Sequence, residues 1–358
     1  MRLNYKIVIA MLVLAIFAVG SVSAAEVVAD DVIDDSVDDV VIDDVPLSDS
    51  VQDEDDTIYD EIQTTRGYDV NDSMDSNTIN RYINTTSTGS GVVNFTPGTY
   101  KSMALVLKDN VALYGNGATI YGNGTDNVFT ITGKSNFTIT GFNIIVNSTQ
   151  KAAIYGSNVF NVAITDNTIT GGKDGINIFK TYENVTITGN TISGVTRDAI
   201  SLVNHKTFSD SEWSNWPSSV VSNNNITGGQ YAMFFGGNFK GTISGNTITN
   251  STYGMQFAGK KNETNGKLYA NIYGNTMTGV QTGIDMNHPS IVYLNMYLNN
   301  ILTANPTVNY AISCNSYFIN ATHGPIYVFL NNLNGLVKQS FISKCTLFYP
   351  NTNYIIVP

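Results

Sequence analysis

The sequence predicts an all-β protein whose body is a right-handed parallel β-helix with three strands per coil and about ten coils. Three observations lead to this fold class. A short alternating pattern centred on an asparagine recurs along the chain. The recurring segments are rich in Ile, Val, Thr, Tyr and Phe, and glycine and asparagine separate them. This combination is typical of short stacked strands and not of helices.

The repeat consists of a short strand, a Gly or Asp, an Asn and a second short strand. It is clearest in residues 162–169, 185–192, 242–248 and 270–277. Weaker copies extend the series of residues at the central position, which are Asn116, Phe142, Asn167, Asn190, Asn224, Asn246, Asn275, Asn299 and Asn331. Successive members lie 22 to 34 residues apart, which is the period of a solenoid with insertions.

Strands this short cannot bury a face on their own, but coils stacked about 4.8 Å apart pair each strand with its copies above and below. The central Asn then has two predicted roles. It tolerates the left-handed backbone of a tight bend, and its amide both donates and accepts hydrogen bonds. Stacked copies are therefore expected to form an inward-facing asparagine ladder.

A third strand is predicted about eight residues after the Asn, in residues 175–178, 199–202, 232–235, 254–257 and 283–286. Cys314 and Cys345 occupy similar places in the last two coils. One coil rise lies within the Cα separation that a disulfide accepts. These two cysteines are thus either a disulfide or a stacked pair of buried thiols.

The N-terminus precedes the repeat and has a different character. Residues 1–25 combine Arg2 and Lys6, an apolar run and a Val22-Ser23-Ala24 cleavage motif, which predicts a signal peptide. The alternative is an uncleaved membrane anchor. Residues 26–68 hold sixteen acidic residues between Glu26 and Glu61, with no Lys or Arg among them, and are predicted to be a disordered acidic spacer. The β-helix domain is predicted to occupy 69–358.

The charge distribution excludes some partners. From Ile62 onward the net charge is about +3, so the acidic pI of about 4.6 comes from the spacer. Such a body is not a nucleic-acid-binding surface. Three histidines without metal-binding spacing predict no metal site and no cofactor, with Ca²⁺ capture by the spacer as a weak alternative. The oligomeric state stays open.

A family resemblance supports this fold. The segments 78–83, 92–100 and 111–117 resemble the first coils of the pectin-lyase-like superfamily, and the I-T-G-N-T-I copies resemble its β-helix repeat. The resemblance implies a short N-terminal capping helix. The whole chain is similar to adhesin-like surface proteins of methanogenic archaea, which implies a secreted or cell-surface protein that contacts a glycan or cell-envelope polymer.

One constellation suggests catalysis. Lys173-Asp174 and Arg197-Asp198 precede the third strand in adjacent coils, so stacking is expected to bring the two carboxylates near each other. Their repulsion would raise one pKa and create a general acid, and Arg197 could neutralise a uronate. The polygalacturonase segment N-T-D-G-I-D is only faintly similar, since Asn177 replaces its second Asp. The alternative is ordinary turn chemistry before a strand.

A second constellation suggests binding. The longest interval leaves a loop over residues 204–219 that contains Trp213 and Trp216, the two tryptophans of the chain. Exposed flat rings suit the apolar faces of sugars. Tyr182, His205 and Lys206 are the expected hydrogen-bonding partners of such a ligand. The alternative is that the two rings pin the loop to the body.

Eleven N-x-S/T sequons mark an exported chain that can carry glycan. The glycosylation candidates are Asn84, Asn123, Asn147, Asn184, Asn225, Asn250 and Asn262. The sequence therefore predicts an adhesin-like surface protein that binds glycan. The alternatives are a polysaccharide lyase or glycoside hydrolase acting through Asp174 and Asp198, and a passive spacer in the cell envelope.

Overall fold

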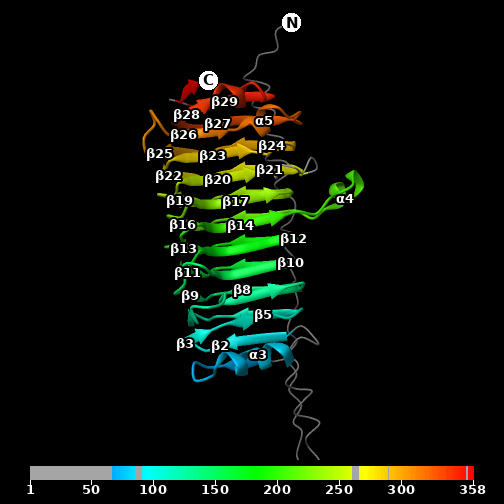
Figure 1. Ribbon diagram of the computed structural model, residues 1–358, viewed down its shortest axis with the longest axis vertical. Coiled ribbons are helices and arrows are strands. Elements are labelled where there is room, and N and C mark those ends of the chain that lie inside the picture. Colours follow the sequence, from blue (N-terminus) through cyan, green and yellow to red (C-terminus); the bar gives the residue numbers. More distant parts are fainter. Residues whose placement is uncertain (1–66, 86–90, 260–265, 289, 352–353) are drawn as a thin grey trace, which may run out of the picture. The chain divides into compact units, whose positions relative to one another are not determined.

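A computed structural model describes residues 67–85, 91–259, 266–288, 290–351 and 354–358, and these residues form the predicted right-handed parallel β-helix (Figure 1). The predicted signal peptide, nearly all of the predicted spacer and the Asn262 sequon lie outside the described residues. The first strand begins at Tyr68, one residue before the predicted domain boundary at residue 69. No helix in the described ranges is long and apolar enough to cross a membrane.

The strands stack in three parallel columns, one for each strand of a coil. The first column, before the ladder position, contains β1 (Tyr68–Val70), β2 (Gly91–Phe95), β5 (Val111–Tyr114), β8 (Ser135–Thr140), the second half of β10 (Ala152–Thr165), the second half of β12 (Asp174–Thr188), β15 (Ser219–Ser222), β18 (Phe239–Ser244), β21 (Leu268–Tyr273), β24 (Ile291–Tyr297), the first part of β27 (Ile326–Asn334) and β29 (Leu347–Asn351).

The second column, after the ladder position, contains β3 (Thr99–Met103), β6 (Thr119–Gly122), β9 (Asn143–Val146), β11 (Thr168–Gly171), β13 (Thr191–Ser193), β16 (Asn225–Thr227), β19 (Thr247–Thr249), β22 (Thr276–Val280), β25 (Asn300–Thr303) and the last part of β27. The third column contains β4 (Leu105–Val106), β7 (Phe129–Thr132), the first halves of β10 and β12, β14 (Asp198–Asn204), β17 (Tyr231–Gly237), β20 (Tyr253–Ala258), β23 (Thr282–Asn287), β26 (Tyr310–Cys314), β28 (Leu336–Lys338) and β30 (Ile355–Val357).

The interior is a continuous apolar core because each strand turns every second side chain inward. One such row in the first column consists of residues that are fully buried, namely Ile139, Ile164, Ile187, Val221, Ile243, Ile272, Met296 and Val328. Each side chain that leaves water in this way contributes about 1.5–3 kcal/mol. The in-register stacking of like residues therefore holds the coils together.

Short helices complete the stack. The helix α3 (Ser76–Thr85) lies at the N-terminal end of the coils and buries Ile79 and Ile83, which confirms the predicted capping helix (Figure 1). Asn80 fixes it by accepting from the Val106 backbone N–H at 2.8 Å and donating to the Ala104 carbonyl at 3.1 Å. Near the other end, α5 (Ser316–Ile319) and α6 (Gln339–Ile342) stack the rings of Phe318 and Phe341.

The asparagine ladder is confirmed for seven of the eight predicted members. The Oδ1 atom of each Asn accepts from the backbone N–H and the Nδ2 of the Asn one coil earlier, at 2.8–3.1 Å. The chain of bonds runs through Asn167, Asn190, Asn224, Asn246, Asn275, Asn299 and Asn331. Phe142 precedes it and donates its N–H to Asn167.

Two details of the ladder prediction are wrong. Asn116 lies outside the ladder and is exposed, and the buried Ala118 stands in register before Phe142. The left-handed backbone also belongs to the residue before the ladder Asn, as at Gly245 with φ of 63° and Asn223 with φ of 55°. The ladder Asn is therefore selected for its hydrogen bonds, and the bend is made by its predecessor.

Candidate functional site

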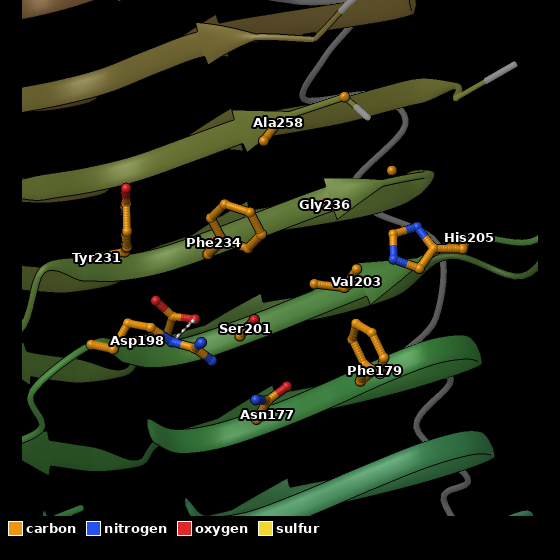
Figure 2. Close-up of a pocket in the computed structure, with 13 residues that line it drawn as sticks. Asn177, Phe179, Asp198, Ser201, Val203, His205, Tyr231, Phe234, Gly236 and Ala258 are labelled. Atoms are coloured by element: carbon orange, nitrogen blue, oxygen red, sulfur yellow. Dashed lines mark ion pairs between the residues drawn. The ribbon is translucent and has the colours of Figure 1, made fainter. Parts of the chain in front are cut away.

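A pocket of about 480 Å³ opens on the outer side of the third column, between β12 and β20 (Figure 2). The pocket results from the in-register pairing of the strands, because the outward residues of successive strands align into rows. One row contains Asn177, Ser201 and Phe234, and a second contains Val203, Gly236 and Ala258. The two glycines at 236 and 237 leave the surface low there, so the pocket is bounded by Phe179 and His205 at one end and by the acidic cluster at the other.

The acidic cluster consists of Asp174, Arg197 and Asp198, as the sequence predicts. The Arg197 guanidinium donates from Nε and Nη2 to the two oxygens of Asp174, at 2.9 and 2.7 Å. The same Nε lies 3.2 Å from Asp198 Oδ2. Both aspartates are buried, with 3 % and 4 % of their surface exposed, whereas Arg197 is partly exposed. One guanidinium therefore bridges the two carboxyl groups and offsets part of their repulsion.

The two carboxylates differ in their freedom to react. Burial raises the pKa of Asp198 to about 6, with the like charge of Asp174 adding to the effect, while Arg197 and a hydrogen bond from Ser201 oppose it. Asp198 lines the pocket, so a carboxyl group with a raised pKa faces the pocket interior. Asp174 is instead fully occupied, because it binds Arg197 with both oxygens and also accepts from Asn177 Nδ2 at 2.8 Å.

The contact with Asp174 also sets the orientation of Asn177. Because Asp174 only accepts, it fixes which side of the Asn177 amide is the nitrogen. The Oδ1 atom of Asn177 then lies at the pocket wall, buried and without a hydrogen-bond partner in the part of the chain that the structure describes. A buried acceptor in this state favours a ligand that brings a hydroxyl or amide N–H.

Aromatic side chains form the apolar part of the pocket. Phe234 stands over β17, and the Tyr231 ring meets it edge to face at a centroid distance of 5.6 Å (Figure 2). Phe179 meets His205 in the same way at 5.6 Å. Sequence reasoning missed Phe179, Tyr231 and Phe234. Strict alternation could not have found both, because Ala232 and Met233 are both buried between the outward Tyr231 and Phe234.

The loop with the two tryptophans contradicts the expectation of exposed rings. It folds into an arm, residues 204–218, that contains the short helix α4 (Asp210–Asn215) and extends from the side of the coils (Figure 1). Trp213 and Trp216 are only 7 % and 6 % exposed and form a separate small core with Phe208 and Tyr269. The rings therefore pin the loop, and neither offers a flat face to a sugar.

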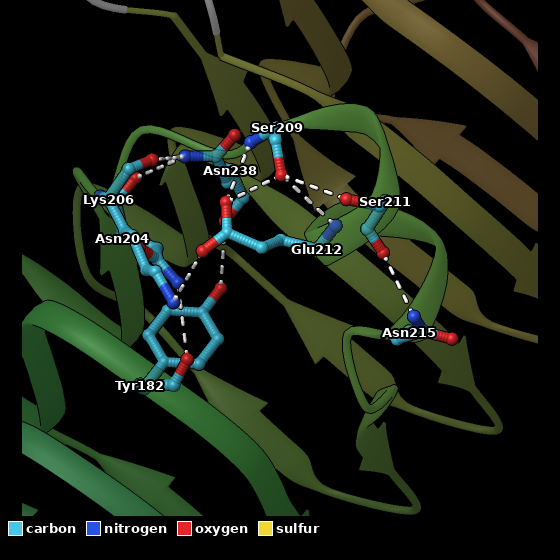
Figure 3. Close-up of polar contacts among 8 residues, drawn as sticks. All are labelled: Tyr182, Asn204, Lys206, Ser209, Ser211, Glu212, Asn215 and Asn238. Atoms are coloured by element: carbon cyan, nitrogen blue, oxygen red, sulfur yellow. Dashed lines mark hydrogen bonds and ion pairs between the residues drawn. The ribbon is translucent and has the colours of Figure 1, made fainter.

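The other residues predicted to bind ligand are mostly structural parts of this arm (Figure 3). Tyr182 is buried and donates its hydroxyl to the Asn238 carbonyl at 3.2 Å. Lys206 lies over the Trp216 ring at 4.7 Å and 3.9 Å from Glu212, which itself completes a capping box with Ser209. Of the five predicted binding residues, only His205 lines the pocket.

Cys314 and Cys345 are both free thiols, so the structure has the pair of thiols and not the disulfide. Cys314 is buried at the end of β26 and lies 3.3 Å from Ser340 Oγ, while the partly buried Cys345 donates to the Phe341 carbonyl at 3.4 Å. Each thiol has a hydrogen-bonding partner on α6. Burial, with a smaller effect of the Cys314 sulfur, raises the pKa of Cys345 to about 12, which keeps this thiol protonated and unreactive.

The glycosylation candidates within the described ranges differ in accessibility. Asn84, Asn147, Asn184, Asn225 and Asn250 are exposed. The Asn123 amide is half-buried and donates to Asp126 at 2.9 Å. Asn184 Nδ2, the atom that a glycan would occupy, donates to Asn161 Oδ1 at 3.1 Å in an external asparagine row. Glycan at Asn123 or Asn184 would therefore cost a hydrogen bond.

Within the described ranges, no three His, Cys, Asp or Glu side chains come together as a metal site. Comparison with known proteins adds one finding on the coils around the pocket. A family described as "Right handed beta helix region" matches residues 103–277, which include the acidic cluster and Phe234. This match and the parallel columns support a pectin-lyase-like β-helix. No curated protein matches the chain.

Proposed function

From the premise that the body of this chain is a right-handed parallel β-helix with a pocket on its third column, we propose that the protein is exported and binds a glycan at the cell surface. The observation that carries the proposal is the lining of the pocket. Phe179 and Phe234 offer ring surface for the apolar faces of a sugar, while one face of Tyr231 is covered by Tyr253, which stacks on it at 4.9 Å. Asn177 and Ser201 offer polar atoms beside these rings, as saccharide hydroxyls require.

The pocket moves the proposed binding site away from the tryptophan arm. The arm has satisfied its own aromatic and polar groups, whereas the pocket residues face solvent on an open side of the coils. The adhesin-like resemblance and the sequons are consistent with a surface location. An adhesin of this kind would hold its ligand without changing it.

A second candidate function rests on Asp198. A carboxyl group with a pKa of about 6 at a pocket wall has the proton affinity of a general acid. A lyase or hydrolase also needs a base or nucleophile, and Arg197 and Asn177 hold the neighbouring Asp174. Catalysis would thus require Asp174 to be released from the guanidinium, which is why we place binding first.

The test is a screen of the full chain against immobilised and free oligosaccharides that records both bound protein and released reducing ends or unsaturated uronates. We expect binding without products, and we expect Phe234→Ala to weaken it about tenfold through loss of ring contact. Thr247→Ala, on the outer side of the second column, is the matched control and should bind normally.

Two outcomes would contradict the proposal. Products that disappear in Asp198→Asn while binding persists would make the protein an enzyme. Absence of both binding and products across the screen would support a passive spacer in the cell envelope.

A further inference from the structure

The charges at the acidic end of the pocket do not balance. Asp174 and Asp198 are both buried, and the single guanidinium of Arg197 serves the two. Asp174 receives two hydrogen bonds from it, at 2.9 and 2.7 Å, whereas Asp198 has one contact, at 3.2 Å. When both carboxyl groups are ionised, this cluster is one positive charge short. The shortage falls on Asp198, which lines the pocket.

The titration of Asp198 agrees with this geometry. Burial raises the pKa of Asp198, the charge of Asp174 adds to the rise, and the opposing effect of Arg197 does not cancel it. Lys173 also favours the ionised form of Asp198, with the smallest effect of the groups that act on it. A buried carboxylate without a full counter-ion is expected to behave in this way.

The polar side chains beside the cluster have already used their donors. Asn177 Nδ2 donates to Asp174 at 2.8 Å, and the Ser201 hydroxyl donates to Asp198 in the next coil. These two residues lie one above the other on adjacent strands (Figure 2). They therefore offer acceptors to a ligand, namely the lone pairs of Ser201 Oγ and the Asn177 Oδ1 atom, which has no partner among the described residues.

A third buried carboxylate lies beyond the pocket, in the same outward row. Asp285 is two coils from Phe234, and it accepts hydrogen bonds from three neutral side chains, those of Gln256, Asn287 and Ser313. Burial raises the pKa of Tyr231, which lines the pocket, and the charges of Asp198 and Asp285 add to the rise. The pocket thus lies in the negative field of carboxylates on both of its sides.

We infer that the glycan bound in this pocket contains amino sugars, and that an ammonium group of one of them pairs with Asp198. This inference rests on the proposed glycan binding. An ammonium group is compact, carries the missing positive charge and has three donors for the acceptors of Asp198, Ser201 and Asn177. A uronate is disfavoured, because its carboxylate adds a negative charge and Arg197 is already paired.

Calorimetric titration of the full chain with matched hexamers tests this inference. The β-1,4-linked hexamers of glucosamine, N-acetylglucosamine and glucose differ in one substituent, and a galacturonate hexamer supplies the opposite charge. We expect the glucosamine hexamer to bind at least tenfold more tightly than the glucose hexamer, and the galacturonate hexamer to bind most weakly. A chelator is included so that Ca²⁺ cannot bridge a carboxylate, and about 0.15 M salt screens exposed charges.

Two variants separate the pocket from other negative charges, since the acidic residues between Glu26 and Glu61 attract any polycation. Asp198→Asn leaves those residues intact and should abolish the preference for glucosamine over glucose while binding of the glucose hexamer persists. Asp126→Asn removes an exposed carboxylate outside the pocket and should keep the preference. Circular dichroism checks that both variants are folded.

The outcomes distinguish this inference from the proposed function. A galacturonate or N-acetylglucosamine hexamer that binds as tightly as the glucosamine hexamer would overturn the inference and leave glycan binding standing. So would a glucosamine preference that survives Asp198→Asn. If no hexamer binds, the proposed glycan binding and this inference fail together. A preference that is lost in Asp198→Asn and kept in Asp126→Asn would support the inference.

Discussion

The asparagines of the ladder show how one side chain can satisfy several buried groups at once. Asn246 accepts from the N–H and the Nδ2 of Asn224, and it donates Nδ2 to Asn275 Oδ1 and to the Val221 carbonyl. Every one of these atoms is buried inside the coils. No apolar residue of the same size could replace it, since its neighbours are polar and need partners.

We therefore expect Asn246→Ala to lower the free energy of unfolding by about 3 kcal/mol, because at least two buried groups lose a partner at about 1–3 kcal/mol each. Urea unfolding followed by circular dichroism measures this change. Asn225→Ala, an exposed position on β16, is the control and should stay within about 0.5 kcal/mol of the parent. Equal effects of the two substitutions would mean that the ladder bonds contribute nothing specific.

The raised pKa of Asp198 predicts that this group stabilises the fold more at low pH than at neutral pH, although Arg197 lies 3.2 Å away. Its pKa of about 6 in the folded chain exceeds the ordinary value of 3.8, so the folded state binds its proton more tightly than the unfolded state. The contribution of Asp198 to the free energy of unfolding is most favourable below about pH 4. It falls by up to about 3 kcal/mol as the pH rises through about 6. Asp198→Asn should remove this loss.

Urea midpoints of the parent and Asp198→Asn at pH 4 and pH 7 test the sign. The urea midpoint of Asp198→Asn relative to that of the parent should be higher at pH 7 than at pH 4. Asp126→Asn is the control, because Asn123 and Thr125 hold the pKa of that exposed carboxyl below its usual value, outside this pH window. A constant difference across the window would show that the pKa of Asp198 is not raised.

At the scale of one coil, different residues make the bend before the ladder Asn in different coils. Gly245 and Gly274 make it with φ of 63°, Asp166 and Asn223 with φ of 55°, and Leu298 makes it with φ of 55°. A leucine in the left-handed region costs about 1–2 kcal/mol, whereas glycine adopts it freely and asparagine tolerates it. The coils with Leu298 and Leu330, the latter at φ of 54°, therefore have the less favourable bends.

This comparison predicts a reciprocal pair of substitutions at equivalent positions of neighbouring coils. Gly274→Ala should destabilise by about 1 kcal/mol for conformational reasons alone, since the nearest atom to an added Cβ is 3.9 Å away. Leu298→Asn should stabilise by about 0.5 kcal/mol, because Leu298 is exposed and loses little packing. Thermal unfolding of dilute protein measures both. Changes of the same sign would contradict the account.

At the scale of the whole molecule, the repeat predicts the fold because it encodes local pairing that is the same in every coil. Period-two alternation identifies the side chains that point into the core. The interval between successive ladder Asn residues identifies which strands lie next to each other. The same logic brings Asp174, Arg197 and Asp198 together. It fails for Trp213 and Trp216, because an irregular insertion, which also carries Phe208 and Lys206, packs these rings against Tyr269 of β21. It also misses the aromatic pocket, because the depth between Phe179 and Phe234 depends on Gly236 and Gly237 in one coil.

The ladder has a further consequence for the length of the molecule. Each Asn makes the same bonds to the coil before and the coil after, so the bonding does not record which coil it belongs to. Asn275 and Asn299 are 24 residues apart, and loss of that stretch would place Gly274 directly before Asn299 with the bend and the next rung intact. Duplication of the stretch would equally add one rung. The stack can therefore gain or lose height by whole coils without breaking the ladder.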